Sequence, residues 1–181
     1  MYGIHEITKL TAVTFTGKNR LQSPRLMLRE FTLADASHVL ALNSEPEILK
    51  YLHEPLLKNI AEAEIILTQK IFPKYDIGLG RWATFLRSDN KFIGWCGLKF
   101  RAELNEIDLG YRFLKSSWGK GYATEAAMHT LQYAAENLKT QEIIGRAHVE
   151  NIASQVVLQK IGMKYIKDET VDDCPVKTYH W

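Results

Sequence analysis

Two glycines between an apolar strand and a long helix are the residues of this chain best suited to bind an anion. Gly119 and Gly121 follow strand-like alternation at 108–114, and residues 124–138 carry Ala, Met and Leu at helical spacing. The first N–H groups of a helix lack partners within it, and the helix dipole is positive there. A glycine also has no Cβ to collide with a phosphate. The pattern therefore indicates a backbone anion site, although a tight turn without a ligand would use the same residues.

The spacing of these glycines excludes the two most familiar nucleotide motifs. Thr124 occupies the position of the third glycine of G-x-G-x-x-G. The pattern G-x-x-x-x-G-K-[ST] of nucleoside-triphosphate sites is absent as well. The natural ligand is therefore expected to be neither a dinucleotide nor a nucleoside triphosphate.

A second polar pair begins a short helix near the carboxyl end of the chain. Asn151 and Ser154 stand three residues apart, within one helical turn, and Gly162 is a suitable stop after the helix. The apolar side of this helix is supplied by Ile152, Val156, Val157 and Ile161. Taken alone, the segment is explained by Asn151 capping the helix and Ser154 facing solvent.

Two carboxylates precede the glycine turn on one strand. Glu106 and Asp108 are two residues apart, and so they share a strand face with Gly110. Such a pair can hold a cationic amine, and one carboxylate can take a proton from it, directly or through water. Two solvated acids on an exposed strand face fit the pattern equally well.

Taken together, these segments resemble the GNAT superfamily of acetyl-CoA-dependent N-acyltransferases. They are W-G-K-G-Y-A-T-E-A at 118–126 and N-x-x-S-x-x-x-L-x-K-x-G-M at 151–163, in order and about thirty residues apart. Within the superfamily, the chain looks most like the branch of Rim-type ribosomal-protein N-terminal acetyltransferases. The resemblance covers about residues 23–181, including the opening strand P-R-L-M-L-R at 24–29.

The resemblance implies an α/β GNAT fold, with a mixed central sheet flanked by helices and two central strands that splay apart. Antiparallel strands followed by a strand–helix–strand pattern point to a mixed sheet independently. We expect a single acetyltransferase domain at 23–181 after an N-terminal extension at 1–22. Acetyl-CoA, as co-substrate, is expected between the strands at 106–114 and 142–149.

The backbone of residues 118–124 and Asn151 can hold the pyrophosphate and pantetheine of the co-substrate. A backbone N–H near Tyr111 or Phe113 is expected to polarise the thioester carbonyl. No metal site is expected, because the histidines lack ligand spacing. The expected cofactor-binding residues are Tyr111, Phe113, Trp118, Gly119, Lys120, Gly121, Tyr122, Ala123, Thr124, Asn151 and Ser154.

Three side chains are candidates for catalysis. The wider superfamily often protonates the departing thiolate with a Tyr on the later helix, where this chain has Leu158. In the Rim-like branch a serine at the position of Ser154 has that role, and the resemblance carries it to Ser154. Asp108 matches a glutamate that precedes Gly-Tyr in many Rim-like sequences. Asp108 and Glu106 are expected to bind the amine or to accept its proton.

The expected function is transfer of an acetyl group from acetyl-CoA to a primary amine. A protein or peptide N-terminal α-amine is the leading acceptor, by family branch. A small amine, such as an aminoglycoside, a polyamine or an amino acid, is the alternative acceptor. A non-catalytic acyl-CoA-binding sensor is the alternative outside catalysis, but the intact G-x-G loop, Asn151 and Ser154 favour an enzyme.

The composition is that of an ordinary globular domain. The 181 residues are 46% hydrophobic and 24% charged, which suffices for one domain with a real core. A net charge of +2 is too balanced to indicate direct nucleic-acid or membrane binding. Cys96 and Cys174 form no disulfide framework or zinc spacing. Without a spanning apolar run or a signal-peptide pattern, a cytoplasmic monomer or homodimer is expected.

The coarse element order is read from periodicity and turn residues. Helices are expected at 33–42, at 59–72 with a stop at Pro73, at 124–138 and after Asn151. An edge strand is possible within 4–15. The other strands are expected at 25–31, 82–87, 91–101, 106–114, 142–149, 164–167 and 176–180.

Overall fold

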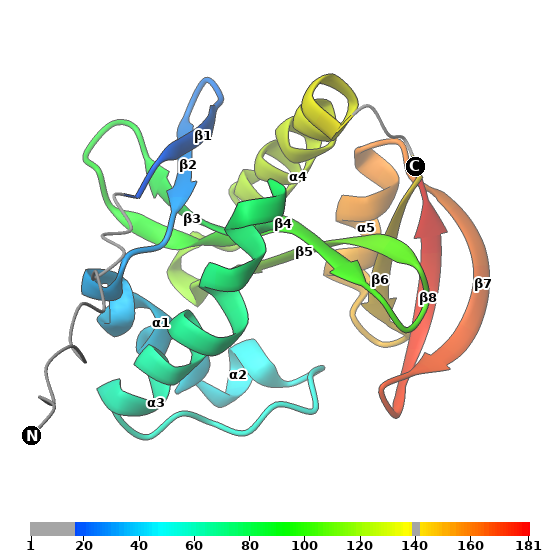
Figure 1. The fold of residues 1–181 in the computed structure, drawn as a ribbon. Helices are drawn as coiled ribbons and strands as arrows, with labels where there is room; N and C mark the ends of the chain where they lie inside the picture. The colour runs from blue at the N-terminus through cyan, green and yellow to red at the C-terminus, as the bar shows by residue number, and fades with distance from the viewer. Residues whose placement is uncertain (1–16, 139–141) are drawn as a thin grey trace, which may run out of the picture.

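A mixed β-sheet runs through the whole molecule (Figure 1). The computed structural model describes residues 17–138 and 142–181, and within them the sheet has eight strands in the order β1-β2-β3-β4-β5-β6-β8-β7. Among these strands, β5 and β6 are the parallel pair and the other neighbours are antiparallel. The strands are β1 Asn19–Gln22, β2 Leu26–Glu30, β3 Gly80–Leu86, β4 Phe92–Arg101, β5 Glu106–Phe113, β6 Ile143–His148, β7 Lys164–Val171 and β8 Cys174–His180.

Helices cover both faces of this sheet. On one face, Thr130 of α4 lies against Cys96 of β4, and Ser154 of α5 lies against Tyr111 of β5. On the other face, Asn43 of α1 accepts a hydrogen bond from Arg112 of β5. The α-helices are α1 Ala36–Asn43, α2 Pro46–Leu49, α3 Ile60–Ile66, α4 Tyr122–Tyr133 and α5 Ile152–Lys160. Among the described helices, none is long and apolar enough to cross a membrane.

The sheet opens between its two parallel strands. Strands β5 and β6 pair only where Ile107–Leu109 faces Ile143–Gly145. Beyond that point, β5 stays paired with β4 as far as Phe113, whereas β6 stays paired with β8 as far as His148. The two central strands therefore splay, which confirms the predicted α/β GNAT fold with a mixed sheet flanked by helices.

The helix predicted at 59–72 differs from the observed structure. The α-helix ends at Ile66, a π-helical turn follows at Leu67–Ile71, and a 3-10 helix then runs over Phe72–Ile77. Pro73 does not stop the chain from being helical. It lies in the first turn of the 3-10 helix, where a missing N–H costs no hydrogen bond.

At both outer edges of the sheet, more residues form β-strand than the sequence predicts. Residues Asn19–Gln22, which lie in the predicted N-terminal extension, pair with β2. The edge strand considered within 4–15 lies outside the described residues. Strand β7 continues past 167 to Val171, because Asp172 and Asp173 have φ values of +52° and +60° and make a two-residue hairpin turn to β8.

Candidate active site

The glycine turn has the backbone conformation that only glycine adopts readily. Gly119 and Gly121 have φ values of +72° and +77°. A Cβ on Gly119 would meet nothing within 4 Å, and one on Gly121 would lie 3.5 Å from Nη2 of Arg25. The space beside the turn is therefore open. Gly121 is also the N-cap of α4 and offers no side-chain hydrogen bond, so the N–H groups of the first turn are available to an anion.

A single arginine before β2 fixes this turn from the outside. Arg25 donates from Nη1 to the carbonyl of Lys120 at 3.0 Å. It also forms an ion pair with Glu125 at 2.6 Å, and its guanidinium lies 4.7 Å from the ring centroid of Tyr122. These contacts hold the turn and the start of α4 in one arrangement before any ligand arrives.

Two side chains of the turn make contacts within it. The indole Nε1 of Trp118 donates to the carbonyl of Phe113 at 2.8 Å, and Nζ of Lys120 donates to the carbonyl of Ser116 at 2.8 Å. The indole N–H of Trp118 is therefore used to join the turn to the end of β5. The Lys120 side chain remains exposed, and its positive charge lies beside the anion-binding backbone.

The backbone of β5 offers donors toward the splay. The N–H of Leu114 donates to Ile93 of β4 at 2.9 Å. Backbone directions alternate along a strand, so the N–H groups of Tyr111 and Phe113 point away from β4 and toward β6. Because β6 has already separated at this level, these two N–H groups face the splay. They are the two positions expected from the sequence.

A pair of hydroxyl groups spans β5 and α5 beside the splay. The Tyr111 hydroxyl lies 2.8 Å from Oγ of Ser154 and 3.1 Å from its carbonyl oxygen. Asn151 caps α5, because its side chain accepts a hydrogen bond from the N–H of Ser154 at 3.1 Å. Burial raises the pKa of Tyr111 above its ordinary value, so this hydroxyl keeps its proton at neutral pH. The sequence assigned Tyr111 only a backbone role and gave no sign of this contact.

Leu158 confirms that the usual tyrosine position holds no proton donor. Its side chain is 1% exposed, and a Cβ on Gly145 of β6 would lie only 2.7 Å from Cδ2 of Leu158. Leu158 therefore packs α5 against β6. Any protonation from this helix must come from another residue.

The two predicted acids have different surroundings. They lie on the face of β3–β6 opposite α4 and α5, which we call the Asp108 face. Oδ1 of Asp108 is buried and has no hydrogen-bond partner among the described residues. Burial raises the pKa of Asp108 to about 6, although Arg146 and Arg101 act in the opposite direction. Glu106 instead forms an ion pair with Arg146.

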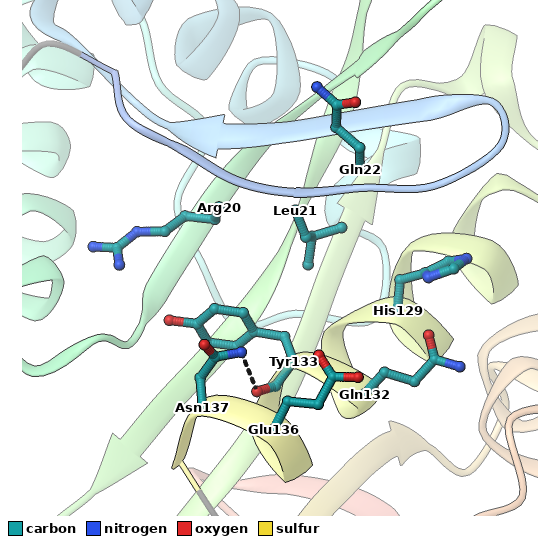
Figure 2. Close-up of a pocket in the computed structure, with 8 residues that line it drawn as sticks. All are labelled: Arg20, Leu21, Gln22, His129, Gln132, Tyr133, Glu136 and Asn137. Carbon is teal, nitrogen blue, oxygen red and sulfur yellow. Dashed lines mark hydrogen bonds between the residues drawn. The ribbon is translucent and has the colours of Figure 1, made fainter.

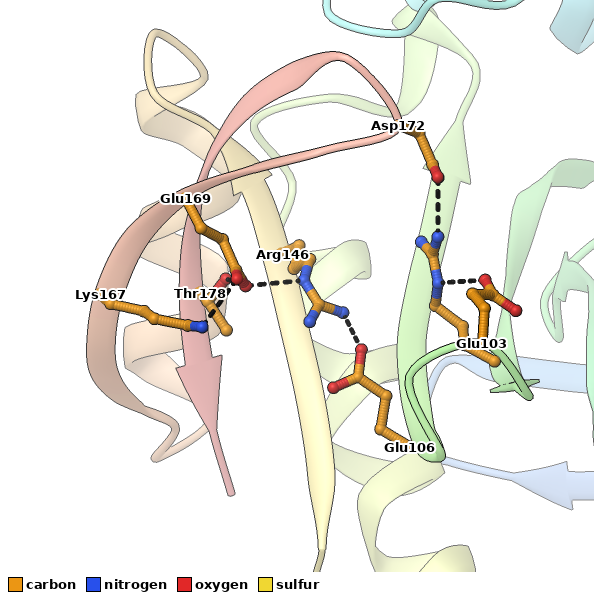
Figure 3. A network of polar contacts seen from close by, with 8 residues as sticks. Glu103, Glu106, Arg146, Lys167, Glu169, Asp172 and Thr178 are labelled. Atoms are coloured by element: carbon orange, nitrogen blue, oxygen red, sulfur yellow. Dashed lines mark hydrogen bonds and ion pairs between the residues drawn. The ribbon is translucent and has the colours of Figure 1, made fainter.

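Glu106 belongs to a network of polar contacts that joins β5, β6, β7 and β8 (Figure 3). Arg146 of β6 contacts both Glu106 and Glu169, the latter from Nε at 3.3 Å. The Thr178 hydroxyl donates to Glu169 at 2.6 Å. Nearby, Arg101 at the end of β4 contacts Asp172 of the β7–β8 turn at 2.8 Å and Glu103 at 3.0 Å. Glu106 is therefore held in a structural network, whereas Oδ1 of Asp108 has no hydrogen-bond partner among the described residues.

Sequence reasoning missed Arg112 on the Asp108 face. Nη2 of Arg112 donates to Glu54 at 2.9 Å, and Nη1 of the same side chain donates to Asn43. These bonds attach α1 and the segment after α2 to β5. Tyr51 stacks on His148 with ring centroids 5.2 Å apart, beside the same strands. The available signal was the charged Arg112 within an otherwise apolar strand end.

A separate pocket of about 160 Å³ lies between β1 and α4 (Figure 2). It shares no residue with the predicted site, and its lining is mostly polar. Within it, Nδ2 of Asn137 donates to the carbonyl of Tyr133 at 3.0 Å. The lining residues are Arg20, Leu21, Gln22, His129, Gln132, Tyr133, Glu136 and Asn137. The chemistry of the splay lies elsewhere, so we assign this pocket no part in it.

Solved structures of acetyltransferases share this fold. RimL, a ribosomal L7/L12 α-N-protein acetyltransferase solved with coenzyme A, superposes with a TM-score of 0.76 at 17% identity, over 90% of this chain and 96% of its own. The spermidine N-acetyltransferase of Vibrio cholerae, solved with CoA and spermine, gives a TM-score of 0.74 at 19% identity, over 88% and 96%. At these identities the likeness establishes the fold alone.

Sequence comparison establishes the family. The uncharacterized N-acetyltransferase YnaD of Bacillus subtilis (strain 168) is 29% identical over 145 residues, which cover 80% of this chain and 82% of YnaD. The family described as acetyltransferase (GNAT) domain matches residues 25–164, which include β2 to β6, the glycine turn and α5. On these grounds the chain belongs to the GNAT family of acetyltransferases.

Proposed function

We propose that this protein transfers an acetyl group from acetyl-CoA to a primary amine, with a protein or peptide N-terminal α-amine as the leading acceptor. One observation carries the proposal. At the level where β5 leaves β6, one face of β5 carries the hydroxyl pair of Tyr111 and Ser154, and the other carries the unpartnered carboxylate of Asp108. A proton donor and a proton acceptor thus lie on opposite faces of a single strand.

The described residues fit acetyl-CoA. The open space at Gly119, the uncapped start of α4 and the charge of Lys120 suit a pyrophosphate. The N–H groups of Tyr111 and Phe113 suit the amide and carbonyl groups of a pantetheine arm with its thioester. When bound, acetyl-CoA supplies the activated acetyl group. These residues hold it in place and orient its carbonyl.

Ser154 is the proposed proton donor to the sulfur side of the reaction, and Tyr111 positions it. Tyr111 has one proton to donate, and two oxygens of Ser154 lie within reach. When Tyr111 donates to Oγ, the Ser154 hydroxyl proton is free to point into the splay. Because burial raises the pKa of Tyr111, Tyr111 keeps its own proton, and water in the splay returns a proton to Ser154 after the thiol has formed.

Asp108 is the proposed partner of the amine. A free α-amine has a pKa of about 8 and a lysine amine one of about 10.4, so both are largely protonated at neutral pH. With a pKa of about 6, Asp108 is a carboxylate at neutral pH and can hold the ammonium form. It can also accept the proton that the amine must lose before attack, directly or through water. Because proximity supplies much of the rate in a direct transfer, losing Asp108 slows the reaction without abolishing it.

The choice of acceptor rests on the likeness to the Rim-type branch. RimL is by its name an α-N-protein acetyltransferase, but the polyamine enzyme of Vibrio cholerae superposes almost equally well, with TM-scores of 0.76 and 0.74. A small amine such as a polyamine, aminoglycoside or amino acid is therefore the second candidate.

The test is an acceptor screen that measures thiol release from acetyl-CoA, with mass spectrometry of the product. Peptides with free and with blocked N-termini, small amines, and a reaction without amine form the panel. Amine-dependent thiol release together with an acetylated amine is the expected result. Tight CoA binding without release for every acceptor would instead identify the chain as an acyl-CoA sensor.

A further inference from the structure

Most cations of the Asp108 face already have carboxylate partners. Each of Arg112, Arg146 and Arg101 contacts at least one acid. The pairs are Arg112 with Glu54, Arg146 with Glu106 and Glu169, and Arg101 with Asp172 and Glu103. Asp108 is an acid of this face without such an ion pair. A cation of the same face that also lacks an ion pair could therefore bind a ligand together with Asp108.

Arg81 of β3 is such a cation. It is partly buried, and its guanidinium carbon lies 4.5 Å from the ring centroid of Trp95. Arg81 makes no side-chain hydrogen bond or ion pair with another described residue, and Oε2 of Glu54 accepts its hydrogen bond from Arg112. Burial and the nearby charge of Arg112 lower the pKa of Arg81, and the opposing charges of Glu54 and Asp108 do not restore it.

Strand register puts Arg81 and Asp108 on either side of the largely buried indole of Trp95. Arg81 faces Gly97 of β4, and Gly97 faces Gly110 of β5. The indole of Trp95 extends over this row, because a Cβ on Gly110 would lie 3.2 Å from Cη2 of Trp95. Asp108 is two residues before Gly110 on the same face. Strands two apart are separated by about 10 Å, a span that a small molecule or a dipeptide unit covers.

We infer that the acceptor amine also carries an anionic group, a carboxylate or a phosphate, which Arg81 binds across Trp95 while Asp108 holds the amine. This inference rests on the proposed function and narrows its acceptor class. A planar guanidinium binds such oxygens in a bidentate manner, which favours Arg over a hydrated ammonium. A polyamine or aminoglycoside would instead bring a second positive charge toward Arg81, at an energetic cost. Acidic peptides and amino acids are therefore favoured over polycations.

The test uses matched acceptors that differ by one anionic group. The pairs are Ala-Asp-Ala-amide with Ala-Asn-Ala-amide, 4-aminobutyrate with its amide, and O-phosphoethanolamine with ethanolamine, and spermidine is the polycation. The third pair separates phosphate from carboxylate recognition. Thiol release gives kcat and KM for wild type, Arg81→Gln and Arg81→Lys. Lys99→Gln is the matched control, because Lys99 faces Asp108 across β4 and β5 but is exposed.

For at least one pair, wild type should prefer the anionic member roughly ten- to a hundredfold in kcat/KM, the range of one charged hydrogen-bonded contact. Arg81→Gln should remove that preference by raising KM for the anionic member alone. Arg81→Lys should restore part of it, and Lys99→Gln should keep it. A wild-type preference for the neutral members or for spermidine overturns the inference. The inference is also overturned if Arg81→Gln lowers kcat/KM equally for both members of each pair, or if it lowers CoA affinity.

Binding measured without turnover separates this inference from the proposed function. Calorimetry of the same acceptors into the CoA-loaded protein reports recognition even when no thiol is released. Arg81-dependent binding of an anionic amine without any turnover would support the inference while rejecting catalysis. Turnover or binding that is indifferent to the anionic group would reject the inference and leave acetyl transfer standing.

Discussion

The two sides of the splay are built in different ways. The side toward α4 and α5 is largely backbone, because the donors that we propose for an anion are N–H groups of the glycine turn, the first turn of α4, and β5 at Tyr111 and Phe113. The Asp108 face is built from side chains of β3, β4, β5 and β6 and of the segment that carries Glu54. A backbone site binds the one ligand that its conformation fits. The side chains of a site can change without changing the fold, and so we propose that acceptor specificity is set on the Asp108 face.

Because the proposed CoA site depends on backbone conformation, we expect one substitution in the glycine turn to abolish CoA binding. In Gly121→Glu, a side chain enters a φ of +77° and a carboxylate stands where the pyrophosphate is expected. We expect CoA affinity to fall more than a hundredfold, as measured by calorimetry.

Gly162→Glu is the matched control for that change. Gly162 has a φ of +89° and nothing within 4 Å of a Cβ, and it lies after α5, away from the turn. The same residue in a comparably strained backbone should leave CoA affinity unchanged. Equal affinity of folded Gly121→Glu and wild type would remove the glycine turn from the site.

The same contrast explains how much of the site could be predicted from sequence. A backbone site needs particular residues at fixed spacing within a short segment, and so Gly119, Gly121 and Asn151 stand out in the sequence. The row from Arg81 through Gly97 to Gly110 exists only because of strand register, which no local pattern of this chain specifies. The Tyr111–Ser154 contact joins residues 43 apart and is equally hidden.

The fold follows the same rule. Strand β5 was predicted to within one residue, and the helix predicted at 124–138 is observed as α4 followed by a π-helical segment at Ala134–Leu138. The sequence missed features that depend on context. Pro73 is tolerated because a new helix begins around it, and β7 is long because Asp172 and Asp173 adopt left-handed conformations.

The proposed proton donor, Ser154, lies between the two sides. We expect its substitution to have the second largest effect on activity. Ser154→Ala should lower kcat roughly ten- to a thousandfold, because thiolate protonation then depends on water. Tyr111→Phe keeps the Ser154 hydroxyl and should lower kcat by about tenfold. CoA affinity should be nearly unchanged in both variants, as checked by calorimetry. If Tyr111→Phe proved the more damaging change, Tyr111 rather than Ser154 would be the donor.

On the Asp108 face, we expect a smaller and pH-dependent effect. The ionised carboxylate is the form that binds an ammonium or takes its proton, so wild-type kcat/KM should rise with pH through about 6. Asp108→Asn should lose this ionisation and about tenfold of the rate at pH 7, with a smaller deficit at alkaline pH, where more amine is neutral.

Glu106→Gln tests the neighbouring acid. Because Glu106 is already paired with Arg146, Glu106→Gln should change kcat/KM for the amine by less than Asp108→Asn does. Matching pH profiles of kcat/KM for wild type, Asp108→Asn and Glu106→Gln would exclude both carboxylates from acceptor chemistry.

The smallest effect is on stability, and it has the opposite sign to the effect on activity. The folded-state pKa of Asp108 is about 6 and lies above the ordinary value of 3.8, because burial disfavours the carboxylate and Glu106 adds to this, while Arg146, Arg101 and Lys99 oppose it. A raised folded pKa leaves stability intact below about pH 4 and removes it as pH rises toward 6. Asp108→Asn should therefore be more stable than wild type at pH 7.5, by no more than about 3 kcal/mol.

Urea unfolding of both proteins from pH 4 to 7.5 measures this difference, which should grow up to about pH 6 and then stay level. A difference that is independent of pH would mean that Asp108 is well solvated, and the argument for a carboxylate held ready for an amine would lose its physical basis.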